Sequence, residues 1–552
     1  MMSGFRMMLS PFSRRTGQIL LAIAVALSGG APSAVAGAPS PRLEFSPAEW
    51  VLARAVADDP GLAAWYGSTG LQPVFAAPDS APLRAALIAE AGQARMHGLP
   101  DVYGVEHLRA LDRNVRQNVE IEIEISFARS FSRWVHDVGG GILDPRRVHP
   151  EIRRDVPRAS LEQQLNRFVH APDPVAALAS VAPQAPEYRA LQTALAARTG
   201  PVIDPSLPEI PTGVWREGAR DPAIALMRAR LAAAGLASAS PDPQLFDPDL
   251  GRQLRAYQAR VGLAPDGVAG PRTLDRLNGG KGADSRDLLI ALERMRWMNG
   301  HDLTARMIWV NLPEFNVRVK DGGRTIYESR AVIGKDRDDW RTPEFSDVMQ
   351  NVVVNPSWNV PRSMAIRDYL PRLQKNRFAV AHLDVVDSRG RVVDRASVDF
   401  SRYTAKSFPY RLRQKPSADN ALGEVKFIFP NSMNIYLHDT PTKGLFSESV
   451  RAFSNGCIRV QKPVELAHVL LEGASADPAA TYARARQAGA ERFLKVTGQP
   501  VHLVYFTTTV DEDGTIRHFR DIYDRDPAVW RALQQAAAEA GPTGLETAAL
   551  AQ

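Results

Sequence analysis

The segment RAFSNGCIRV, residues 451–460, contains Cys457, the only cysteine of the 552-residue chain. Gly456 directly precedes it, and a glycine lets the backbone turn tightly and approach a ligand closely. The sequence KPVELAHVLLEG, which begins at Lys462, predicts a helix, so the thiol is expected just ahead of a helix N-terminus. The positive end of the helix dipole and the nearby Arg459 would both favour the thiolate and lower the pKa of Cys457.

A reactive thiol also needs a base, and the best candidate lies in the segment IYLHDT, residues 435–440. This short apolar run predicts a strand that ends at His438. The backbone carbonyl or the carboxylate of Asp439 is expected to hold the other ring nitrogen of that histidine. The backbone N–H groups of Gly456 and Cys457 would form an oxyanion hole. Without this context, a lone cysteine is a buried and inert thiol about as often as it is a reactive one.

Both segments belong to a β-rich region that we predict to be a catalytic domain over residues 285–525. A helix from Ser285 leads into runs of alternating polarity, and Asp321-Gly322-Gly323 predicts a hairpin turn. An Arg-rich polar insertion at about 364–420 begins as a helix and is long enough to predict a lid. Residues 526–552 are expected to form a C-terminal helix and tail. Further strands are predicted at 348–354, 426–429, 434–438, 501–510 and 515–523.

The first part of the chain, over residues 45–210, predicts a helical domain in which Ser46 is a suitable N-cap. Residues 119–125 alternate like a strand. The apolar residues that follow, among them Phe127 and Phe131, have helical spacing, which favours a helix. No group of residues in this domain has the spacing expected of a catalytic or metal site.

The N-terminus has the features of a signal peptide over residues 1–36. Three arginines precede the apolar run 19–27, and the small residues Ala34-Val35-Ala36 follow it. Nine apolar residues are too few for a spanning helix, which needs about 20. The sequence therefore predicts export to the periplasm, and no later apolar run predicts a transmembrane segment in the mature chain.

The composition is that of a globular protein, with 45% hydrophobic and 23% charged residues. The formal net charge is +6, and removal of the three arginines of residues 1–36 leaves +6 − 3 = +3. This small excess is spread along the chain, so a nucleic-acid partner is not expected. The sequence has no Cys/His cluster suited to zinc, and no metal or organic cofactor is expected.

Residues 220–279 predict a small unit of three short helices. Its sequence LRAYQARVGLAPDGVAGPRTLDRL, residues 254–277, resembles the peptidoglycan-binding module found on many wall-acting enzymes. The alternative is a generic three-helix linker domain.

The two segments around His438 and Cys457 resemble the His…Ser/Thr-x-Gly-Cys-x-Arg signature of the L,D-transpeptidase catalytic domain. The segments 351–362 and 423–427 extend the likeness, as does the order of the domains. The resemblance is to the large, scaffold-bearing branch of the family in Gram-negative bacteria. It implies a multi-domain α+β chain with a helical N-terminal scaffold domain, a small three-helix peptidoglycan-binding module and a mainly-β catalytic domain with a long lid insertion.

Carried over by residue, the resemblance makes Cys457 the nucleophile and His438 the base, and Ser454, Gly456 and Arg459 match the surrounding signature. Gly456, Asp439 and Asn455 are the residues expected in oxyanion or orienting roles. Asn455 departs from the pattern, because many members have histidine there, and an amide cannot exchange protons at neutral pH. Arginines of the lid, including Arg402, are expected to pair with acidic stem peptides, although a solvated basic loop is equally consistent. The residues expected to bind substrate are Arg459, Ser454, Tyr436, Trp358, Arg411 and Arg413.

The resemblance implies a two-step acyl transfer on peptidoglycan stem peptides, with release of the terminal D-alanine, a thioester on Cys457 and a 3→3 cross-link to a second stem. Carbapenems would acylate the same thiolate. An L,D-carboxypeptidase or endopeptidase with this nucleophile is the nearest alternative. An inactive peptidoglycan-binding scaffold and a papain-like protease are less favoured. The scaffold domain is a possible contact for other proteins of wall synthesis.

Overall fold

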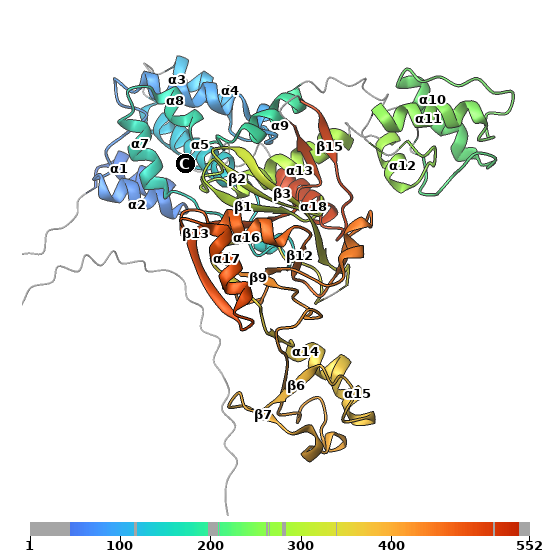
Figure 1. Ribbon diagram of the computed structural model, residues 1–552. Coiled ribbons are helices and arrows are strands. Elements are labelled where there is room, and N and C mark those ends of the chain that lie inside the picture. The colour runs from blue at the N-terminus through green and yellow to red at the C-terminus, as the bar shows by residue number, and fades with distance from the viewer. Residues whose placement is uncertain are drawn as a thin grey trace, which may run out of the picture. The chain divides into compact units, whose positions relative to one another are not determined.

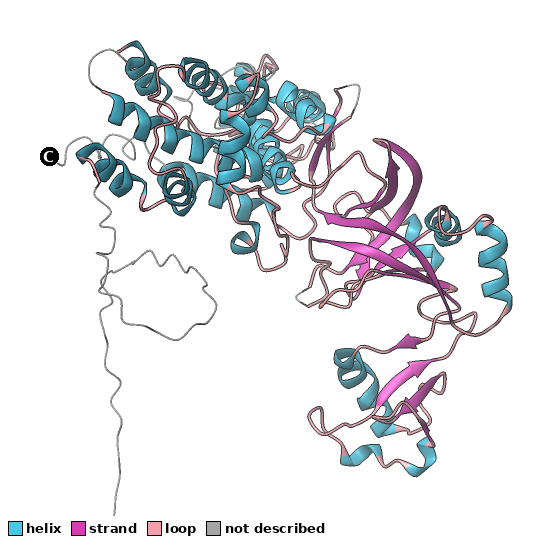
Figure 2. Ribbon diagram, turned by 90° about the vertical axis from the view of Figure 1, so that its left-hand side faces the viewer, coloured by secondary structure: helices cyan, strands magenta, loops and turns pink. Residues whose placement is uncertain are grey.

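The computed structural model describes residues 45–114, 119–196, 208, 210–260, 263, 265–278, 283–337, 339–511 and 514–539 (Figure 1). The predicted signal peptide and the end of the predicted tail lie outside these residues. No helix among the described residues is long and apolar enough to cross a membrane. Helices predominate up to residue 297 and strands from residue 307 onward, which confirms the predicted multi-domain α+β class. Figure 2 shows a helical part of the chain and a part that contains the strands.

The first region is helical, as predicted. Several of its helices begin with a proline that directly follows an aspartate N-cap. The side chains of Asp59 and Asp173 accept hydrogen bonds from the free N–H groups of the first turn of their helices. Ser160 and Gln163 form a reciprocal capping box at another helix. The helices are α1 Pro47–Val56, α2 Pro60–Ser68, α3 Ala81–Ala91, η1 Ala94–His97, α4 Val105–Arg113, α5 Glu120–Gly140, α6 Pro145–Val148, α7 Leu161–Val169, α8 Pro174–Ala179 and α9 Pro186–Ala196.

Helix α5 confirms the helical interpretation of residues 119–138. Ile123, Phe127 and Phe131 recur every four residues and are buried in the core of this region. Glu124 interrupts the apolar pattern but is also buried, where its carboxylate accepts the backbone N–H groups of residues 74–76 at 2.7–2.8 Å. The strand-like alternation therefore includes a buried carboxylate that anchors a loop.

The predicted three-helix unit is present as α10 Pro222–Ala233, α11 Pro248–Arg260 and α12 Pro271–Leu277. Its own core contains Ile224, Leu254 and Leu274. Gln258 joins the helices to the turn before α12, because its amide donates to Asp266 at 2.8 Å and to Val268 O at 3.0 Å.

The sheet of the C-terminal region has nine strands in the order β11-β3-β12-β10-β9-β4-β13-β1-β2, and an additional β2–β3 pairing closes it like a barrel. Alternate residues of its strands form one core, while the intervening positions are more exposed. The strands are β1 Met307–Asn311, β2 Asn316–Asp321, β3 Arg324–Gly334, β4 Phe345–Val354, β9 Val425–Ile428, β10 Leu437–His438, β11 Ala452–Ser454, β12 Ile458–Val460 and β13 Arg492–Val504. A separate hairpin consists of β14 Thr508–Val510 and β15 Ile516–His518.

Helices complete this region. Helix α13 Ala283–Trp297 buries Leu288, Leu292 and Met295 in the core of the N-terminal helices. The later helices are α16 Pro463–Leu471, α17 Pro478–Gln487 and α18 Asp526–Glu539, with the short η5 Lys443–Ser447 between β10 and β11. Helix α18 buries Val529 beside Ile152 of the N-terminal region. The last helix, α18, is therefore packed in a hydrophobic core.

The predicted lid is a folded unit rather than a polar loop. A sheet in the order β5-β8-β6-β7 and short helices surround a core that includes Leu370, Leu383 and Phe400. Its elements are β5 Trp358–Asn359, α14 Arg362–Met364, the π-helical η2 Ala365–Tyr369, α15 Leu370–Lys375, β6 Leu383–Val386, β7 Val392–Val393, η3 Arg395–Ser397, η4 Phe400–Arg402 and β8 Arg411–Gln414.

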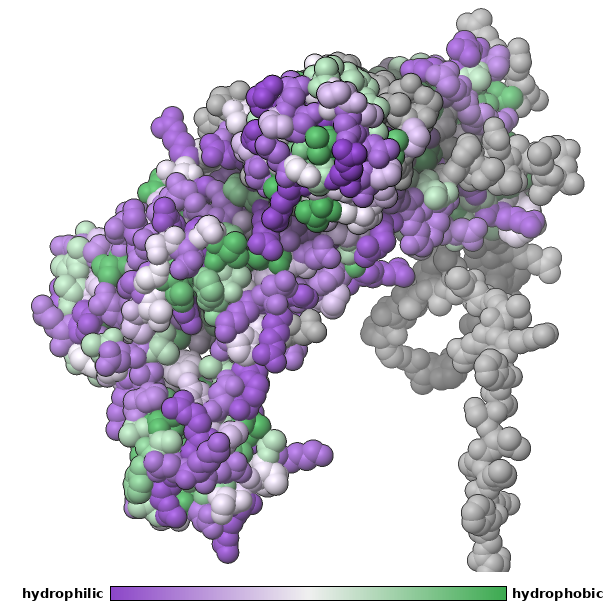
Figure 3. Space-filling model, turned by 90° about the vertical axis from the view of Figure 1, so that its right-hand side faces the viewer, coloured by the Kyte–Doolittle hydropathy of each residue, from purple (hydrophilic) through white to green (hydrophobic). Residues whose placement is uncertain are grey.

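The surface shown in Figure 3 is mainly hydrophilic, and hydrophobic residues lie on it in small separate patches. Exposed large apolar side chains such as Trp50, Phe378 and Phe493 come from different elements. Scattered apolar residues of this kind are usual on a folded protein and do not by themselves mark a binding surface.

Candidate active site

Strands β10 and β12 are parallel neighbours, with Leu437 opposite Ile458 and His438 opposite Arg459. Side chains alternate between the two faces of a strand, and Leu437 and Ile458 both lie in the sheet core. The residues on either side of these two therefore share the opposite face. That face brings together Tyr436, His438, Cys457 and Arg459.

The turn before Cys457 depends on Gly456 and Ser454. Gly456 has φ +113°, a conformation that L side chains rarely adopt, and an added Cβ would lie 3.2 Å from Ile435. The buried Ser454 hydroxyl accepts the Gly456 N–H at 3.1 Å and donates to the Cys457 carbonyl at 2.5 Å. Ser454 thus shapes the turn, and the Gly456 N–H is already used. The predicted oxyanion role of the Gly456 amide is therefore not supported in this structure.

The thiol of Cys457 lies against the segment that leads into β10. Its Sγ is 3.6 Å from the carbonyl oxygen of Asn434, and the Tyr436 hydroxyl is its hydrogen-bond partner. Burial raises the pKa of Cys457 to about 11, and the contact with Tyr436 and the charge of Arg459 only partly oppose this. Burial also raises the pKa of Tyr436, and the neighbouring sulfur adds to that shift.

This direction is opposite to the lowered thiol pKa expected from the sequence. Strand β12 separates Cys457 from α16, which begins at Pro463, so the thiol does not lie at the helix N-terminus. A helix dipole acts mainly within its first turn. Arg459 supplies positive charge as expected, but loss of hydration at the sulfur is the larger effect.

His438 is buried, 5% exposed, and its Nδ1 is hydrogen-bonded to the backbone carbonyl of Asp439. Of the two orienting groups considered, the structure therefore selects the carbonyl. The Asp439 carboxylate instead pairs with Lys443 and accepts the Glu424 N–H at 3.0 Å. With Nδ1 donating, Nε2 is the ring nitrogen free to accept a proton.

The imidazole is neutral at physiological pH, because burial lowers the pKa of His438 to about 3 and the charge of Arg459 lowers it further. No hydrogen bond between His438 and Cys457 is found among the described residues. The rings of Tyr436 and His438 are neighbours, with centroids 5.7 Å apart. A base on the same face as the thiol can close such a gap when substrate binds, since catalytic hydrogen bonds are often long in the free enzyme.

These two pKa shifts predict how the free enzyme reacts with a small alkylating agent. Below a thiol pKa of about 11, the thiolate fraction rises about tenfold for each pH unit. The rate of Cys457 alkylation by iodoacetamide is therefore expected to increase steadily from pH 7 to pH 10. Mass spectrometry of samples quenched at successive times measures this alkylation rate. A plateau that begins below pH 7 would instead indicate a preformed thiolate–imidazolium pair.

Arg459 is the cation of this face. Its Nε is buried without a hydrogen-bond partner in the described chain, and its charge acts on both Cys457 and His438. A guanidinium with unused donors is suited to an anionic ligand. This geometry is compatible with the predicted substrate-binding role of Arg459, which stays a prediction.

Asn455 contacts the insertion rather than the base. Its exposed side-chain amide donates to the sulfur of Met364, in α14, at 2.9 Å. Asn455 is therefore a hydrogen-bond donor at the edge of the site. This fits the expectation that its amide takes no part in proton transfer.

The predicted substrate contacts in the insertion have other partners. Trp358 is buried in the insertion core, with its ring against Tyr369, so the structure gives it a packing role, and its predicted role in substrate binding stays a prediction. Arg411 donates to the Ser388 carbonyl at 3.0 Å, and Arg413 lies 3.6 Å from Asp384. Among the described residues, none of these contacts reaches Cys457. A role for the two arginines in binding substrate stays a prediction.

Three residues next to the turn that holds Cys457 were not identified from the sequence. Thr342 donates its hydroxyl to the Gly456 carbonyl at 2.7 Å, and Tyr523 and Arg525 surround Thr342. They are distant in sequence from Cys457 and belong to no local motif, so only the fold identifies them.

Comparison with protein families finds three domains in the chain. Residues 305–480 match the L,D-transpeptidase catalytic domain, residues 60–195 a scaffold domain and residues 220–277 a "Putative peptidoglycan binding domain". The resemblances stated for the sequence are thereby confirmed. The predicted domain boundaries stay predictions.

A curated protein of Haemophilus influenzae named "Putative L,D-transpeptidase" is 38% identical over 226 residues, which are 40% of this chain and 44% of that protein. The chain thus spans less than half the length of this relative. A crystal structure of an L,D-transpeptidase from Xylanimonas cellulosilytica is 13% identical, with TM-score 0.15. The match covers 54% of this chain and 98% of the crystallised chain. A fused Zn-dependent amidase/peptidase/peptidoglycan-binding domain-containing protein from Clostridium acetobutylicum is 12% identical, with TM-score 0.14. This match covers 53% of this chain and 100% of that protein's chain.

Proposed function

Because the chain carries an L,D-transpeptidase catalytic domain with a peptidoglycan-binding domain and a scaffold domain, we propose that it cross-links peptidoglycan stem peptides through a cysteine nucleophile. The observation that supports this most directly is the shared face of β10 and β12. It holds a thiol, an oriented neutral imidazole and a guanidinium whose Nε is buried. These are a nucleophile, a base and an anion-binding group.

In the first step, Cys457 attacks the carbonyl carbon after the L-centre of the third stem residue. The thiol and imidazole are both neutral at rest, so His438 takes the thiol proton as the C–S bond forms. The Cys457 N–H is free to donate to the developing oxyanion. Collapse of the intermediate breaks the peptide bond, the leaving amine of D-alanine receives the proton from His438, and a thioester remains.

In the second step, an amine from another stem peptide attacks the thioester. His438 takes a proton from the attacking amine and returns it to the sulfur as the C–S bond breaks. The product is a 3→3 cross-link, and the free thiol is restored. Binding of the peptidoglycan-binding domain to the wall would keep the catalytic domain near its substrate.

We further propose that the protein acts in the periplasm after removal of residues 1–36 and that carbapenems acylate Cys457. The supporting features are the arginines and apolar run at the N-terminus, together with the wall-binding domain. Other proteins of wall synthesis are proposed partners of the scaffold domain.

The test is incubation of the chain from residue 37 with disaccharide-tetrapeptide, followed by mass spectrometry of the products. A dimer with the mass of two substrates less one D-alanine supports transpeptidation. Tripeptide alone indicates that water replaces the amine and that the protein is an L,D-carboxypeptidase. Intact substrate with a correctly folded protein would contradict both activities.

A further inference from the structure

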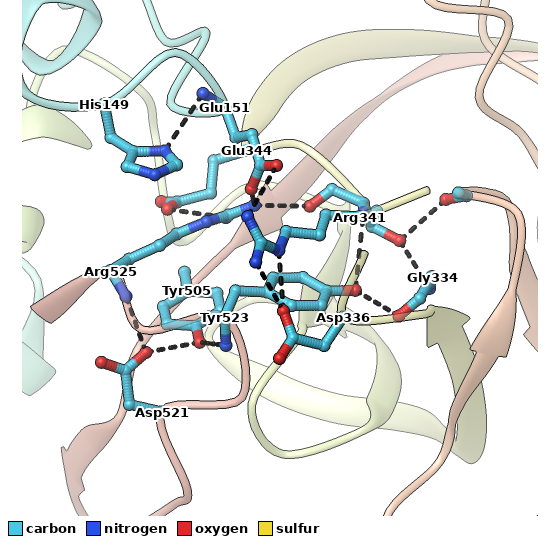
Figure 4. Close-up of polar contacts among 12 residues, drawn as sticks. His149, Glu151, Gly334, Asp336, Arg341, Glu344, Tyr505, Asp521, Tyr523 and Arg525 are labelled. Atoms are coloured by element: carbon cyan, nitrogen blue, oxygen red, sulfur yellow. Dashed lines mark hydrogen bonds and ion pairs between the residues drawn. The ribbon is translucent and has the colours of Figure 1, made fainter. Parts of the chain in front are cut away.

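A chain of buried polar contacts leads from the scaffold domain to the turn that holds Cys457 (Figure 4). At its centre is Arg525, whose side chain is fully buried. Its guanidinium donates to Glu151 of the scaffold domain at 2.8 Å, to Glu344 at 3.0 Å and to the carbonyl of Thr342 at 2.8 Å. One side chain thus joins a scaffold carboxylate to the backbone next to the active site.

Thr342 is the next member of this chain, and it is completely buried. Its hydroxyl accepts the Gly334 N–H at 2.9 Å and donates to the Gly456 carbonyl at 2.7 Å. Tyr523 holds the same segment, because its hydroxyl accepts the Thr342 N–H at 3.3 Å and donates to the Gly334 carbonyl at 2.6 Å. The position of the threonine hydroxyl is therefore fixed from several sides.

The contact with Gly456 has a direct consequence for Cys457. The Gly456 carbonyl and the Cys457 N–H belong to one planar trans peptide and point in opposite directions. Fixing the carbonyl on Thr342 therefore fixes the direction of the N–H. The Cys457 N–H has no hydrogen-bond partner in the described chain, whereas the Gly456 N–H is bound by Ser454. It is the donor left for an oxyanion beside the nucleophile.

We propose that Thr342 is a positioning residue that aims the oxyanion-binding amide of Cys457, and that the scaffold domain holds Thr342 in place through Glu151 and Arg525. This inference rests on the proposed acyl-transfer function. It gives the scaffold domain a part in catalysis without any scaffold residue touching the substrate.

The scaffold side of this chain is well attached. The segment around Glu151 lies beside strand β4, where the Glu344 N–H donates to the Glu151 carbonyl at 2.9 Å and the Arg153 N–H donates to the Glu344 carbonyl at 2.8 Å. Arg154 adds a bond to the Ser346 hydroxyl at 2.6 Å. Removal of the Glu151 carboxylate alone would therefore leave the segment in place. One N–H group of Arg525 would lose its partner, and Arg341, whose guanidinium lies 3.7 Å from the carboxylate, would lose an ion pair.

The experiment compares two reactions of Cys457 in the chain from residue 37: acylation by a carbapenem and alkylation by iodoacetamide. Acylation passes through an oxyanion and alkylation does not. Thr342→Val, which keeps the side-chain shape but removes the hydroxyl, is expected to slow acylation about 10- to 100-fold. Alkylation should stay within about twofold of wild type. Thr342→Ser restores the hydroxyl and should recover most of the acylation rate.

Glu151→Ala tests the scaffold end and is expected to slow acylation about three- to tenfold. Its matched control is Glu187→Ala, which removes another ion pair between the scaffold and the sheet, Glu187–Lys320 at 2.8 Å, that has no contact with Thr342. The control should leave the acylation rate unchanged. Thermal unfolding gives the Tm of each variant, and all assays are run well below that temperature.

Equal acylation by wild type and Thr342→Val would overturn the positioning role, as would a parallel loss of alkylation. Equal losses in Glu151→Ala and Glu187→Ala would show that any weakened domain contact has the same effect and would overturn the scaffold link. A wild-type protein that is alkylated but never acylated would instead refute the proposed function, and the inference with it.

Discussion

Replacing Cys457 with alanine is expected to abolish acyl transfer, with a loss on the order of 10⁵-fold or more. The chain has no other cysteine, and no second thiol can form the thioester. The residual rate would come only from substrate binding and the oxyanion donor. The measurement is dimer formation from disaccharide-tetrapeptide, with intact-protein mass spectrometry to detect the acyl-enzyme.

The control for this variant is its binding to isolated peptidoglycan. The peptidoglycan-binding domain has its own core around Ile224 and Leu254 and does not use Cys457, so binding to sacculi should be unchanged. An adduct on the alanine variant, or dimer formed at more than a small fraction of the wild-type rate, would show that another residue is the nucleophile.

The sequence motif identified the elements of the site because the motif is local. His438 lies in β10 and Cys457 directly precedes β12, the parallel neighbour of β10, and alternation places Tyr436 and Arg459 beside them. Apolar periodicity likewise located helix α5 and the hairpin of β2 and β3. These features depend on residues a few positions apart, which a sequence shows directly.

The pKa of Cys457 was predicted in the wrong direction because two facts are not local. Strand β12 intervenes between the thiol and α16, and the sulfur lies against the Asn434 carbonyl and the Tyr436 hydroxyl. The burial of Trp358 was not expected for a related reason, since the core that buries it is built by the insertion itself. Burial depends on what packs around a residue, and a motif does not show it.

The residues that support the turn at Gly456 and Cys457 are still more remote in the sequence. Thr342 is 114 residues from Gly456, and Arg525 reaches Thr342 over 183 residues and Glu151 over 374. No short pattern connects these positions. The order of domains predicted a scaffold, whereas the contacts that link Glu151 through Arg525 and Thr342 to Gly456 are a property of the folded chain.

Substitution of His438 is expected to have the second largest effect, because both proton transfers of the proposed reaction pass through it. His438→Asn keeps an N–H donor for the Asp439 carbonyl but has no group that accepts a proton near neutral pH. The rate of carbapenem acylation is expected to fall about 10²- to 10⁴-fold, which is the usual contribution of a general base. Single-turnover acylation followed by mass spectrometry measures it.

The pH dependence separates a base from a structural histidine. Without a base, only the Cys457 thiolate reacts, so acylation of the asparagine variant should rise about tenfold per pH unit toward the thiol pKa of about 11. In the wild type, the neutral imidazole is available above its pKa of about 3, and the rate should depend less on pH near neutrality. The difference between the two enzymes must therefore shrink as the pH rises. A constant ratio from pH 6 to pH 10, with unchanged iodoacetamide alkylation, would show that His438 orients the site but does not transfer the proton.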